Sequence, residues 1–238
     1  MTHNPIIVAL DVTGAEEAVR LAKRLRHVVG GFKVGLGLLH GPGPGVVAAL
    51  ADLGKPVFAD AKLHDIPSQT GAAARRLGRW GARWVTAHAF GGSAMLKAAA
   101  EGLGEGSGEQ AGILGVSVLT SLDETSLGKI GVMATPGKLV SKMAKIIDAA
   151  GCEGIVSSAQ ELGVVAEVAP QLLKVIPGIR PGGTDSSEQA RTTTPEKAIA
   201  HGADWLVIGR PIIAANNPEE AAASIANAVG SSADIAED

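Results

Sequence analysis

The stretch IIVALDVTGAEEAVRLAKRLRHVVGGFKVGL, residues 6–36, decides the fold because it contains a complete strand–helix–strand unit. It begins with a short, β-rich apolar run, passes through a segment of helical spacing, and ends in a second apolar run. In the middle segment Val19, Leu21, Ala22 and Leu25 can share one face of a helix. Strands that alternate with helices pair in parallel, so this unit predicts a parallel sheet.

The same alternation continues to the end of the chain. Each further apolar run is too short to form a helix of its own, and Ala-, Leu-, Glu- and Arg-rich sequence separates it from the next. The predicted strands are residues 6–10, 32–36, 56–59, 84–89, 112–119, 154–158, 174–179 and 204–209. This pattern predicts an α/β protein, a single-domain (β/α)8 (TIM) barrel over residues 1–238. The alternative is an open doubly wound sheet, but the G-x-G-x-x-G fingerprint typical of that fold is missing after the first strand.

Several residues have the spacing of helix starts. Thr13 with Glu16, and Ser121 with Glu124, form candidate capping boxes, and Asn217 precedes a proline at a first helical position.

Two connections are longer than a barrel unit needs. Residues 121–153 contain two predicted helices, which indicates a helical elaboration at 121–150. Residues 180–194, RPGGTDSSEQARTTT, are polar and rich in turn-forming residues. A long loop of that kind in a compact domain is typical of a lid or binding loop.

Composition excludes several classes of function. The net charge of −3 with interspersed signs, the 3% aromatic content and the absence of tyrosine argue against a nucleic-acid partner. Cys152 is the single cysteine, so no disulfide can form within the chain and a reducing compartment is expected. The first residues lack a secretory signal pattern, and no apolar run is long enough to span a bilayer. We therefore expect a cytoplasmic protein with no membrane contact.

Polar residues fall where the predicted strands end, which is where barrel enzymes carry their active sites. These residues are Asp11, Asp60, Lys62, His88, Thr120, Arg180 and the pair Gly209–Arg210, while Lys33 lies inside the second predicted strand. The motif D-x-K-x-x-D at 60–65 is the densest group, and residues two apart on a strand project to the same face. An unpaired lysine in an apolar strand is costly, so Lys33 is expected to pair with Asp60. An alternating lysine–aspartate array would keep these groups charged.

Each of these signals has a less specific interpretation. Asp60, Lys62 and Asp65 can form a solvated salt-bridge cluster on a loop. His64 is interpreted as structural, with its side chain facing away from Lys62, and His88 is either a ligand or a hydrogen-bonded core histidine.

The Gly209–Arg210 pair also has two interpretations. A glycine and a guanidinium at a helix start suit a phosphate group, and barrels commonly bind phosphate after their last two strands. In the less specific interpretation Arg210 pairs with a surface carboxylate.

Taken together, four motifs resemble the type 1 orotidine 5′-phosphate decarboxylase family. They are D-x-K-x-x-D-I-P at 60–67, LTS at 119–121, PGIRP at 177–181 and VIGRPI at 207–212, and the resemblance covers nearly the whole chain. It implies a (β/α)8-barrel homodimer that converts orotidine 5′-monophosphate to UMP and CO2 in de novo pyrimidine biosynthesis. It also implies that no metal or organic cofactor takes part.

The resemblance further implies roles for single residues. Lys62 would protonate C6 of the pyrimidine, Asp60 would lie against the substrate carboxylate, and Lys33 would bridge Asp60 and the ribose. Asp65 would reach across the dimer interface into the partner's site. The implied substrate-binding residues are Asp11 and Lys33 for the ribose, Thr120 for the pyrimidine, and Arg180, Gln189, Gly209 and Arg210 for the phosphate.

The chain departs from the family pattern at one place. The family usually reads H-D-I-P-N-T, whereas Ser68 and Gln69 follow Ile66-Pro67 here, and Thr70 comes one residue later. The ribose contact therefore falls to either Gln69 or Thr70.

Three rival functions remain open. One is a Mg²⁺-dependent sugar-phosphate decarboxylase or aldolase on the same barrel, against which Lys33 argues, because a metal site favours an acidic ligand there. The others are a non-catalytic phosphate-ligand binding protein and a phosphosugar barrel of tryptophan or histidine biosynthesis.

Overall fold

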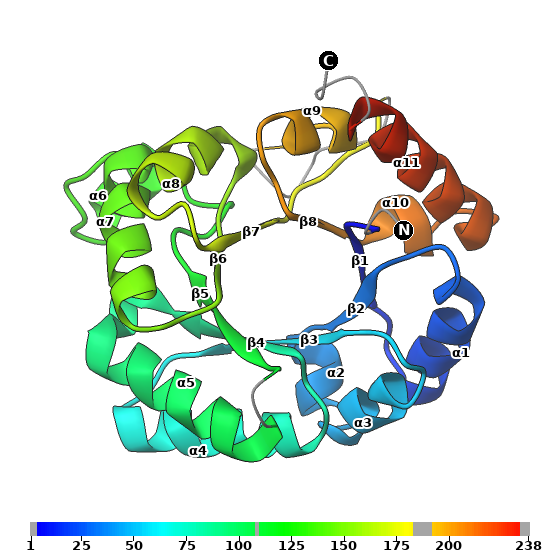
Figure 1. Ribbon diagram of the computed structural model, residues 1–238, viewed down its shortest axis with the longest axis horizontal. Coiled ribbons are helices and arrows are strands. Elements are labelled where there is room, and N and C mark those ends of the chain that lie inside the picture. The colour runs from blue at the N-terminus through cyan, green and yellow to red at the C-terminus, as the bar shows by residue number, and fades with distance from the viewer. Residues whose placement is uncertain (1–3, 108–109, 183–191, 234–238) are drawn as a thin grey trace.

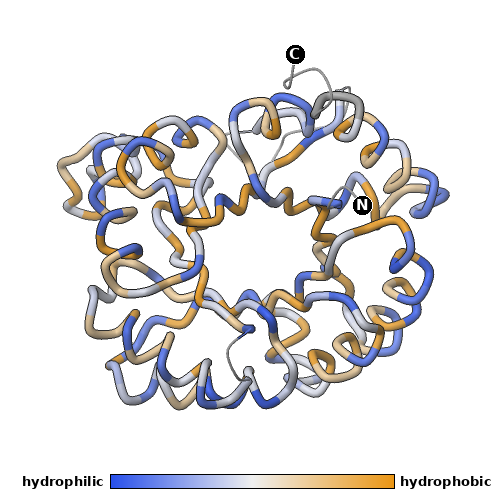
Figure 2. Tube along the Cα trace, viewed as in Figure 1, coloured by the Kyte–Doolittle hydropathy of each residue, from blue (hydrophilic) through white to orange (hydrophobic). Residues whose placement is uncertain are grey.

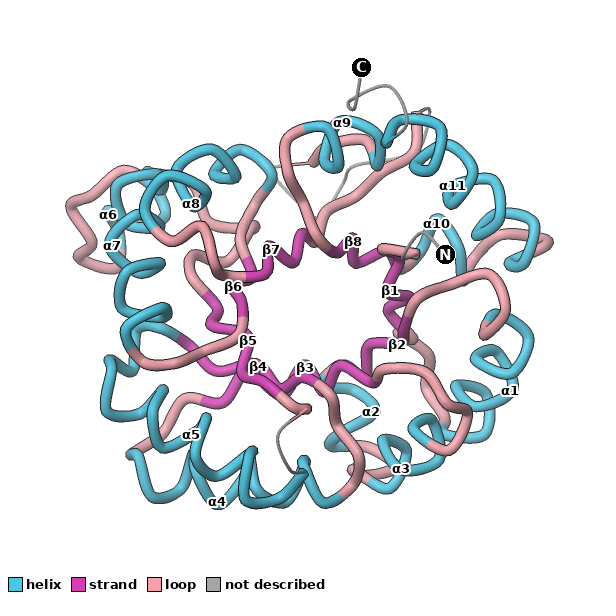
Figure 3. The backbone as a smooth tube through the Cα atoms, viewed as in Figure 1, coloured by secondary structure: helices cyan, strands magenta, loops and turns pink. Residues whose placement is uncertain are grey.

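The structure, a computed structural model, describes residues 4–107, 110–182 and 192–233. In this part of the chain eight parallel strands close into a barrel, in which every strand pairs with the strands before and after it and β8 returns to β1. Figure 3 shows the ring of strands inside a ring of helices. The strands are β1 (Ile6–Ala9), β2 (Gly31–Val34), β3 (Val57–Leu63), β4 (Trp84–His88), β5 (Gly112–Val116), β6 (Gly154–Val156), β7 (Leu173–Ile176) and β8 (Trp205–Ile208). The predicted (β/α)8 barrel is confirmed.

Helices follow the strands and form the outer layer (Figure 1). They are α1 (Ala15–Leu25), α2 (Leu36–His40), α3 (Gly45–Ala51), α4 (Pro67–Arg79), α5 (Gly92–Ser107), α6 (Glu124–Lys129), α7 (Pro136–Ala149), α8 (Leu162–Val168), α9 (Pro195–Ala200), α10 (Arg210–Ile213) and α11 (Pro218–Ala233). Within 121–150, α7 packs against α5, α8 and β6 as a barrel helix does, so α6 is the addition to the basic unit. Of the loop 180–194, residues 183–191 lie outside the described residues.

The helix starts correct two predictions and confirm a third. Helix α1 begins after Gly14 without a side-chain cap, so the box predicted at Thr13 is wrong. At α6 the nearer carboxylate of Asp123 accepts the capping hydrogen bond, so the box predicted at Ser121 is wrong as well. Asn217 does cap α11, because its Oδ1 accepts a hydrogen bond of 3.4 Å from the N–H three residues further on.

Alternation along the strands divides the core into two parts. One set of side chains packs between the barrel and the helices, and the other fills the barrel interior. Figure 2 shows the apolar ring of strands and the more polar outer helices. Inside the barrel Trp84 and Trp205 pack edge to face, with ring centroids 5.0 Å apart. The barrel is therefore plugged by side chains, and any site must lie at its ends.

Helices α4 and α5 pack side by side with their backbones in contact (Figure 1). A Cβ on Gly102 would lie 2.2 Å from the carbonyl oxygen of Gly71, and a Cβ on Gly106 would lie 2.2 Å from that of Arg75. Only glycine, which has no side chain, permits so close an approach at these two points.

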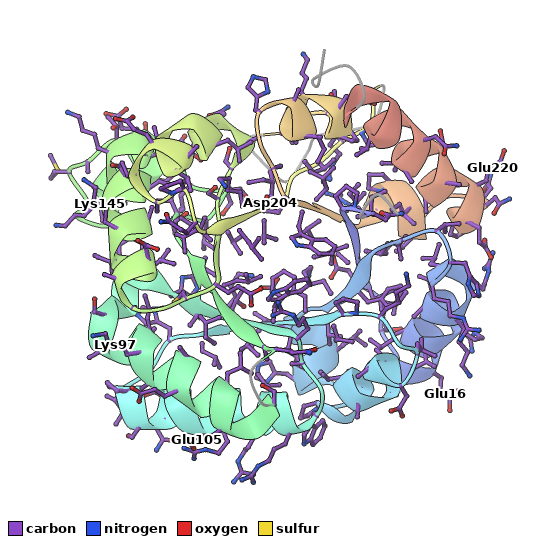
Figure 4. The ribbon with its side chains drawn as sticks, in the orientation of Figure 1. Glu16, Lys97, Glu105, Lys145, Asp204 and Glu220 are labelled. Carbon is purple, nitrogen blue, oxygen red and sulfur yellow. The ribbon has the colours of Figure 1, made fainter. Side chains whose placement is uncertain are left out.

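Charged side chains lie around the outside of the molecule, as Figure 4 shows for Glu16, Lys145 and Glu220. Among the residues that the structure describes, none of the helices has both the length and the apolar character needed to cross a bilayer.

Candidate active site

A cavity of about 190 Å³ opens where the strands end at their carboxyl termini. Apolar side chains that continue the barrel interior form its floor, and Lys33, Asp60 and Lys62 form a charged wall. Residues 119–121, which follow β5, line the cavity beyond this floor. The apolar lining residues are Phe58, Val116, Val118, Val156, Pro177 and Val207.

Strand β3 brings Asp60 and Lys62 into this cavity. They follow Phe58 at every second position, so all three side chains face the barrel, as the alternation predicted. The backbone is not a regular strand, however, because Lys62 has φ of 50°. A non-glycine residue in this left-handed region costs about 1–2 kcal/mol, so other contacts must hold Lys62 in place.

Four charged groups from three neighbouring strands form a chain across the wall. Lys33 Nζ lies 3.4 Å from Asp60 Oδ2 and 3.5 Å from Asp11 Oδ1, while Lys62 Nζ bonds to the other Asp60 oxygen. The expected pairing of Lys33 with Asp60 is therefore confirmed. The side chains of Lys33 and Asp60 are each 12% exposed, whereas that of Asp11 is 57% exposed. Asp60 is the buried centre of the chain, and Asp11 is its solvated end.

The surroundings of Asp60 keep it ionised. Burial alone would raise its pKa, but the positive charges of Lys33 and Lys62 oppose this. Hydrogen bonds from Lys62 and Thr86 add to their effect, and together they hold the pKa of Asp60 below its ordinary value. The cavity therefore presents a fixed negative charge between two lysine side chains.

Thr86 on β4 is a site residue that the sequence analysis missed. Its side chain is fully buried, and its hydroxyl donates a hydrogen bond of 2.9 Å to Asp60 Oδ1. The Thr86 hydroxyl oxygen in turn accepts a hydrogen bond of 2.9 Å from the backbone N–H of Lys62. The signal was its position two residues after Trp84 and two before His88, which indicates that it faces the barrel.

Two histidines lie next to the charged wall. The rings of His64 and His88 have centroids 5.4 Å apart. Burial, followed by the charges of His64 and Lys62, lowers the pKa of His88, and Asp60 opposes this only in part. His88 is therefore neutral at neutral pH.

The segment after β3, residues 64–70, does not line the cavity. Asp65 is exposed, and its carboxylate accepts a hydrogen bond of 2.6 Å from the N–H of Ile66, a residue that is itself 62% exposed. Gln69 is also exposed, whereas Thr70 is buried and its hydroxyl donates to the carbonyl oxygen of Asp65. Within one chain, Asp65 is therefore not a member of the charged array.

The residues expected at the phosphate lie on the far side of the barrel from β3. Arg180 follows β7, and its backbone N–H donates to the carbonyl oxygen of Thr193, which closes the base of the long loop. Gly209 caps α10, and a Cβ there would lie 3.4 Å from Asp11 Oδ2. Arg210 is the first residue of α10 and is exposed, while Gln189 lies outside the described residues.

Metal-binding groups do not gather in the described part of the chain, where no three Asp, Glu, His or Cys side chains are arranged to hold an ion. At Asp60 both carboxylate oxygens already contact ammonium groups.

Comparisons with known proteins agree with this geometry. Residues 4–225 match the family described as "Orotidine 5'-phosphate decarboxylase / HUMPS family". The orotidine 5′-phosphate decarboxylase of Paramagnetospirillum magneticum is 42% identical over 95% of this chain and 99% of its own. That of Anaeromyxobacter sp. strain K is 44% identical over 93% and 96%.

A solved structure of the Lactobacillus acidophilus orotidine 5′-phosphate decarboxylase superposes with a TM-score of 0.83 at 31% identity. It covers 95% of this chain and 99% of its own. From the closed barrel, the charged wall and these relatives together, the chain belongs to the orotidine 5′-phosphate decarboxylase / HUMPS family.

Proposed function

We propose that this protein is an orotidine 5′-monophosphate decarboxylase, a carboxy-lyase that forms UMP and CO2 in pyrimidine biosynthesis. The observation that carries the proposal is the buried Asp60 carboxylate held between the ammonium groups of Lys33 and Lys62 at the barrel mouth. In this reaction the bond between C6 and the carboxylate breaks, and its electron pair stays on C6. Lys62 then gives a proton to C6 and regains one from solvent.

Electrostatics explains why such a wall suits this reaction. The carbanion at C6 is poorly delocalised, so a fixed ammonium provides both charge stabilisation and the proton. Asp60 would face the substrate carboxylate, and their repulsion would favour loss of CO2. We assign the larger effect to Lys62, because only interactions that are stronger in the transition state accelerate the chemical step.

The rest of the substrate extends from the cavity along the rim. A cavity of about 190 Å³ is small for a whole ligand, since pockets that enclose one measure about 300–1,000 Å³. We assign the pyrimidine to the cavity beside Thr120 and the ribose to Asp11 and Lys33. We assign the phosphate to Arg180, Gln189, Gly209 and Arg210.

We also propose that two copies of the chain share their sites. Asp65 is exposed and lies outside the array of its own chain, which suits a residue that completes the array of a partner. Apolar residues exposed at the ends of β2, β3 and β4 support contact at this rim: Leu36 at 47%, Ile66 at 62% and Phe90 at 45%. Gln69, which is exposed while the Thr70 hydroxyl is occupied, is the better candidate for the ribose contact.

The cytoplasm is the proposed location, and it is supported by Cys152, the single cysteine, which is buried. Burial raises the pKa of its thiol to about 12, so Cys152 is not poised for redox or nucleophilic chemistry.

The Mg²⁺-dependent alternative is less well supported. A divalent ion would need the Asp60 oxygens that Lys33 and Lys62 already contact, and a lysine beside a metal ligand repels the ion. No organic cofactor is needed for the proposed reaction.

The test is the ultraviolet absorbance of orotidine 5′-monophosphate mixed with the purified protein in excess EDTA. Conversion to the spectrum of UMP establishes the decarboxylase without a required metal. An unchanged spectrum, together with turnover of a sugar phosphate once Mg²⁺ is restored, would instead support the Mg²⁺-dependent sugar-phosphate decarboxylase or aldolase.

A further inference from the structure

The hydroxyl of Thr86 joins the two groups that the proposed chemistry needs most. It accepts a hydrogen bond from the backbone N–H of Lys62 and donates one to Asp60 Oδ1, each of 2.9 Å. Because a hydroxyl has a single proton, these two bonds fix its orientation. The Thr86 side chain is completely buried, so water does not compete for either bond.

The need for this hydroxyl comes from an irregularity in the sheet. Ala59 on β3 pairs with Val85 on β4, but the next pair is Leu63 with Ala87, so β3 carries extra residues opposite Thr86. Extra residues of this kind leave backbone groups outside the ladder. The Lys62 N–H is such a group, and the Thr86 hydroxyl accepts its hydrogen bond in place of a strand carbonyl.

Thr86 also completes the set of donors around Asp60. Oδ2 faces Lys33, while Oδ1 receives both the Lys62 ammonium and the Thr86 hydroxyl. Side chains from β2, β3 and β4 therefore all contact Asp60. Lys62 is fixed both at its backbone N–H, by Thr86, and at its ammonium group, by Asp60.

We propose that Thr86 is a positioning residue for the decarboxylation, which fixes the left-handed backbone of Lys62 and the carboxylate of Asp60 through one hydroxyl. This inference rests on the proposed function. Thr86 itself touches no substrate, because it does not line the cavity. It acts through Lys62 and Asp60, so its removal should change the chemical step more than substrate binding.

The test compares Thr86→Val, which keeps the shape and removes the hydroxyl, with Thr86→Ser, which keeps the hydroxyl. Misplacement of a reacting group by about 1 Å costs on the order of 100-fold in rate. Thr86→Val should therefore lower kcat by roughly 10- to 100-fold with KM changed by less than about threefold. Thr86→Ser should restore most of kcat.

Ser117→Ala is the matched control. Ser117 is buried near the end of β5 and donates to the carbonyl oxygen of Val156, so this variant loses a buried hydroxyl that does not face Asp60. It should keep kcat within about twofold. Circular dichroism and thermal melting show whether each variant is folded.

Three results would overturn the proposal. They are a folded Thr86→Val with normal kcat, a Thr86→Ser as impaired as Thr86→Val, or a folded Ser117→Ala as impaired as Thr86→Val. Should Thr86→Val not fold, Thr86→Cys replaces it, since a thiol is a weak donor and acceptor, and normal kcat in that variant would equally refute the role.

Crystal structures of the wild type and Thr86→Val separate this proposal from the proposed function. The variant should lose the positive φ of Lys62 or its contact with Asp60, whatever substrate the wild type accepts. An unchanged Lys62 refutes the positioning role, whereas a wild type inactive on orotidine 5′-monophosphate refutes the function.

Discussion

Replacing Lys33 with methionine tests the electrostatic core of the site. The substitution keeps an unbranched side chain of similar length and removes one positive charge. Asp60 then loses one of its two ammonium partners, and Asp11 loses the contact with Lys33. We expect lower stability at neutral pH and a lower kcat/KM, because a carboxylate that is 12% exposed is left with only part of its compensating charge.

The size of the effect follows from the geometry. Two unit charges separated by 3.4 Å interact by about 5 kcal/mol at an effective dielectric constant of about 20. Lys62 stays beside Asp60 and water relaxes around the variant, so the net loss should be about 3 kcal/mol, at the low end for a broken buried pair. Asp11, which is 57% exposed, contributes less than about 1 kcal/mol of this.

The dependence on pH gives the result a distinctive sign. The pKa of Asp60 is held below its ordinary value of 3.8, so its ionised form stabilises the fold at neutral pH, and this stability is lost as pH falls through the folded pKa. Without Lys33 the pKa of Asp60 rises, and the variant takes up the proton at higher pH. The gap between wild type and variant should therefore narrow as pH falls through the raised pKa of the variant, and close once pH is below the folded pKa of the wild type.

The assay is urea unfolding at several pH values and one fixed protein concentration, with kcat/KM measured in parallel. Lys174→Met is the matched control, since Lys174 is 13% exposed and lies 3.6 Å from Asp204, a carboxylate that is 39% exposed. That variant should lose about 1 kcal/mol or less and keep its activity. A Lys33→Met protein as stable as the Lys174→Met protein, with a gap that does not change with pH, would refute the reasoning.

Three other variants test single residues. Lys62→Ala should abolish turnover while circular dichroism shows an intact fold, and substantial residual activity would remove Lys62 from its role as proton donor. If Asp65 serves the partner's site, mixing Lys62→Ala with Asp65→Asn, each inactive alone, should restore roughly a quarter of wild-type activity. Half of the dimers are then mixed, and each mixed dimer has one complete site out of two. No recovery of activity after subunit exchange would argue against sharing. Burial, with nearby positive charge, lowers the pKa of His88, so the stability of the wild type should fall as pH drops below 6.5. The stability of His88→Asn should fall less over the same range. Chemical unfolding that gives the two proteins the same dependence of stability on pH would contradict this.

The barrel was predictable because its signal is local and repeated. Each short apolar run, such as residues 6–10, is followed by a helical segment, and parallel pairing then follows from chain connectivity. The pairing of Lys33 with Asp60 was predictable for a physical reason, namely the cost of a lone ammonium in an apolar strand. Period-two alternation placed Lys62 beside them.

The role of Thr86 was not predictable in the same way. It depends on the irregular pairing of β3 with β4, and that irregularity is a property of two strands together. The left-handed backbone of Lys62 likewise has no signature in the sequence, because such positions usually carry glycine. The cap of α6 was misplaced for a simpler reason, since Ser121 and Asp123 are both good capping residues and only the packed structure selects one.

The direct contact between α4 and α5 makes the rim of the barrel depend on positions far from any ligand. Helix α4 starts two residues after Asp65, and its backbone rests on α5 at Gly102 and Gly106 with no side chain between them. A methyl group added at either glycine would clash with backbone atoms of α4, and no side-chain rotation could relieve that clash. The substitution would therefore have to displace α4 relative to α5. Random mutagenesis should accordingly find inactivating substitutions at Gly102 and Gly106. If two copies share Asp65 as proposed, these substitutions would impair the partner's site more than the site of the chain that carries them.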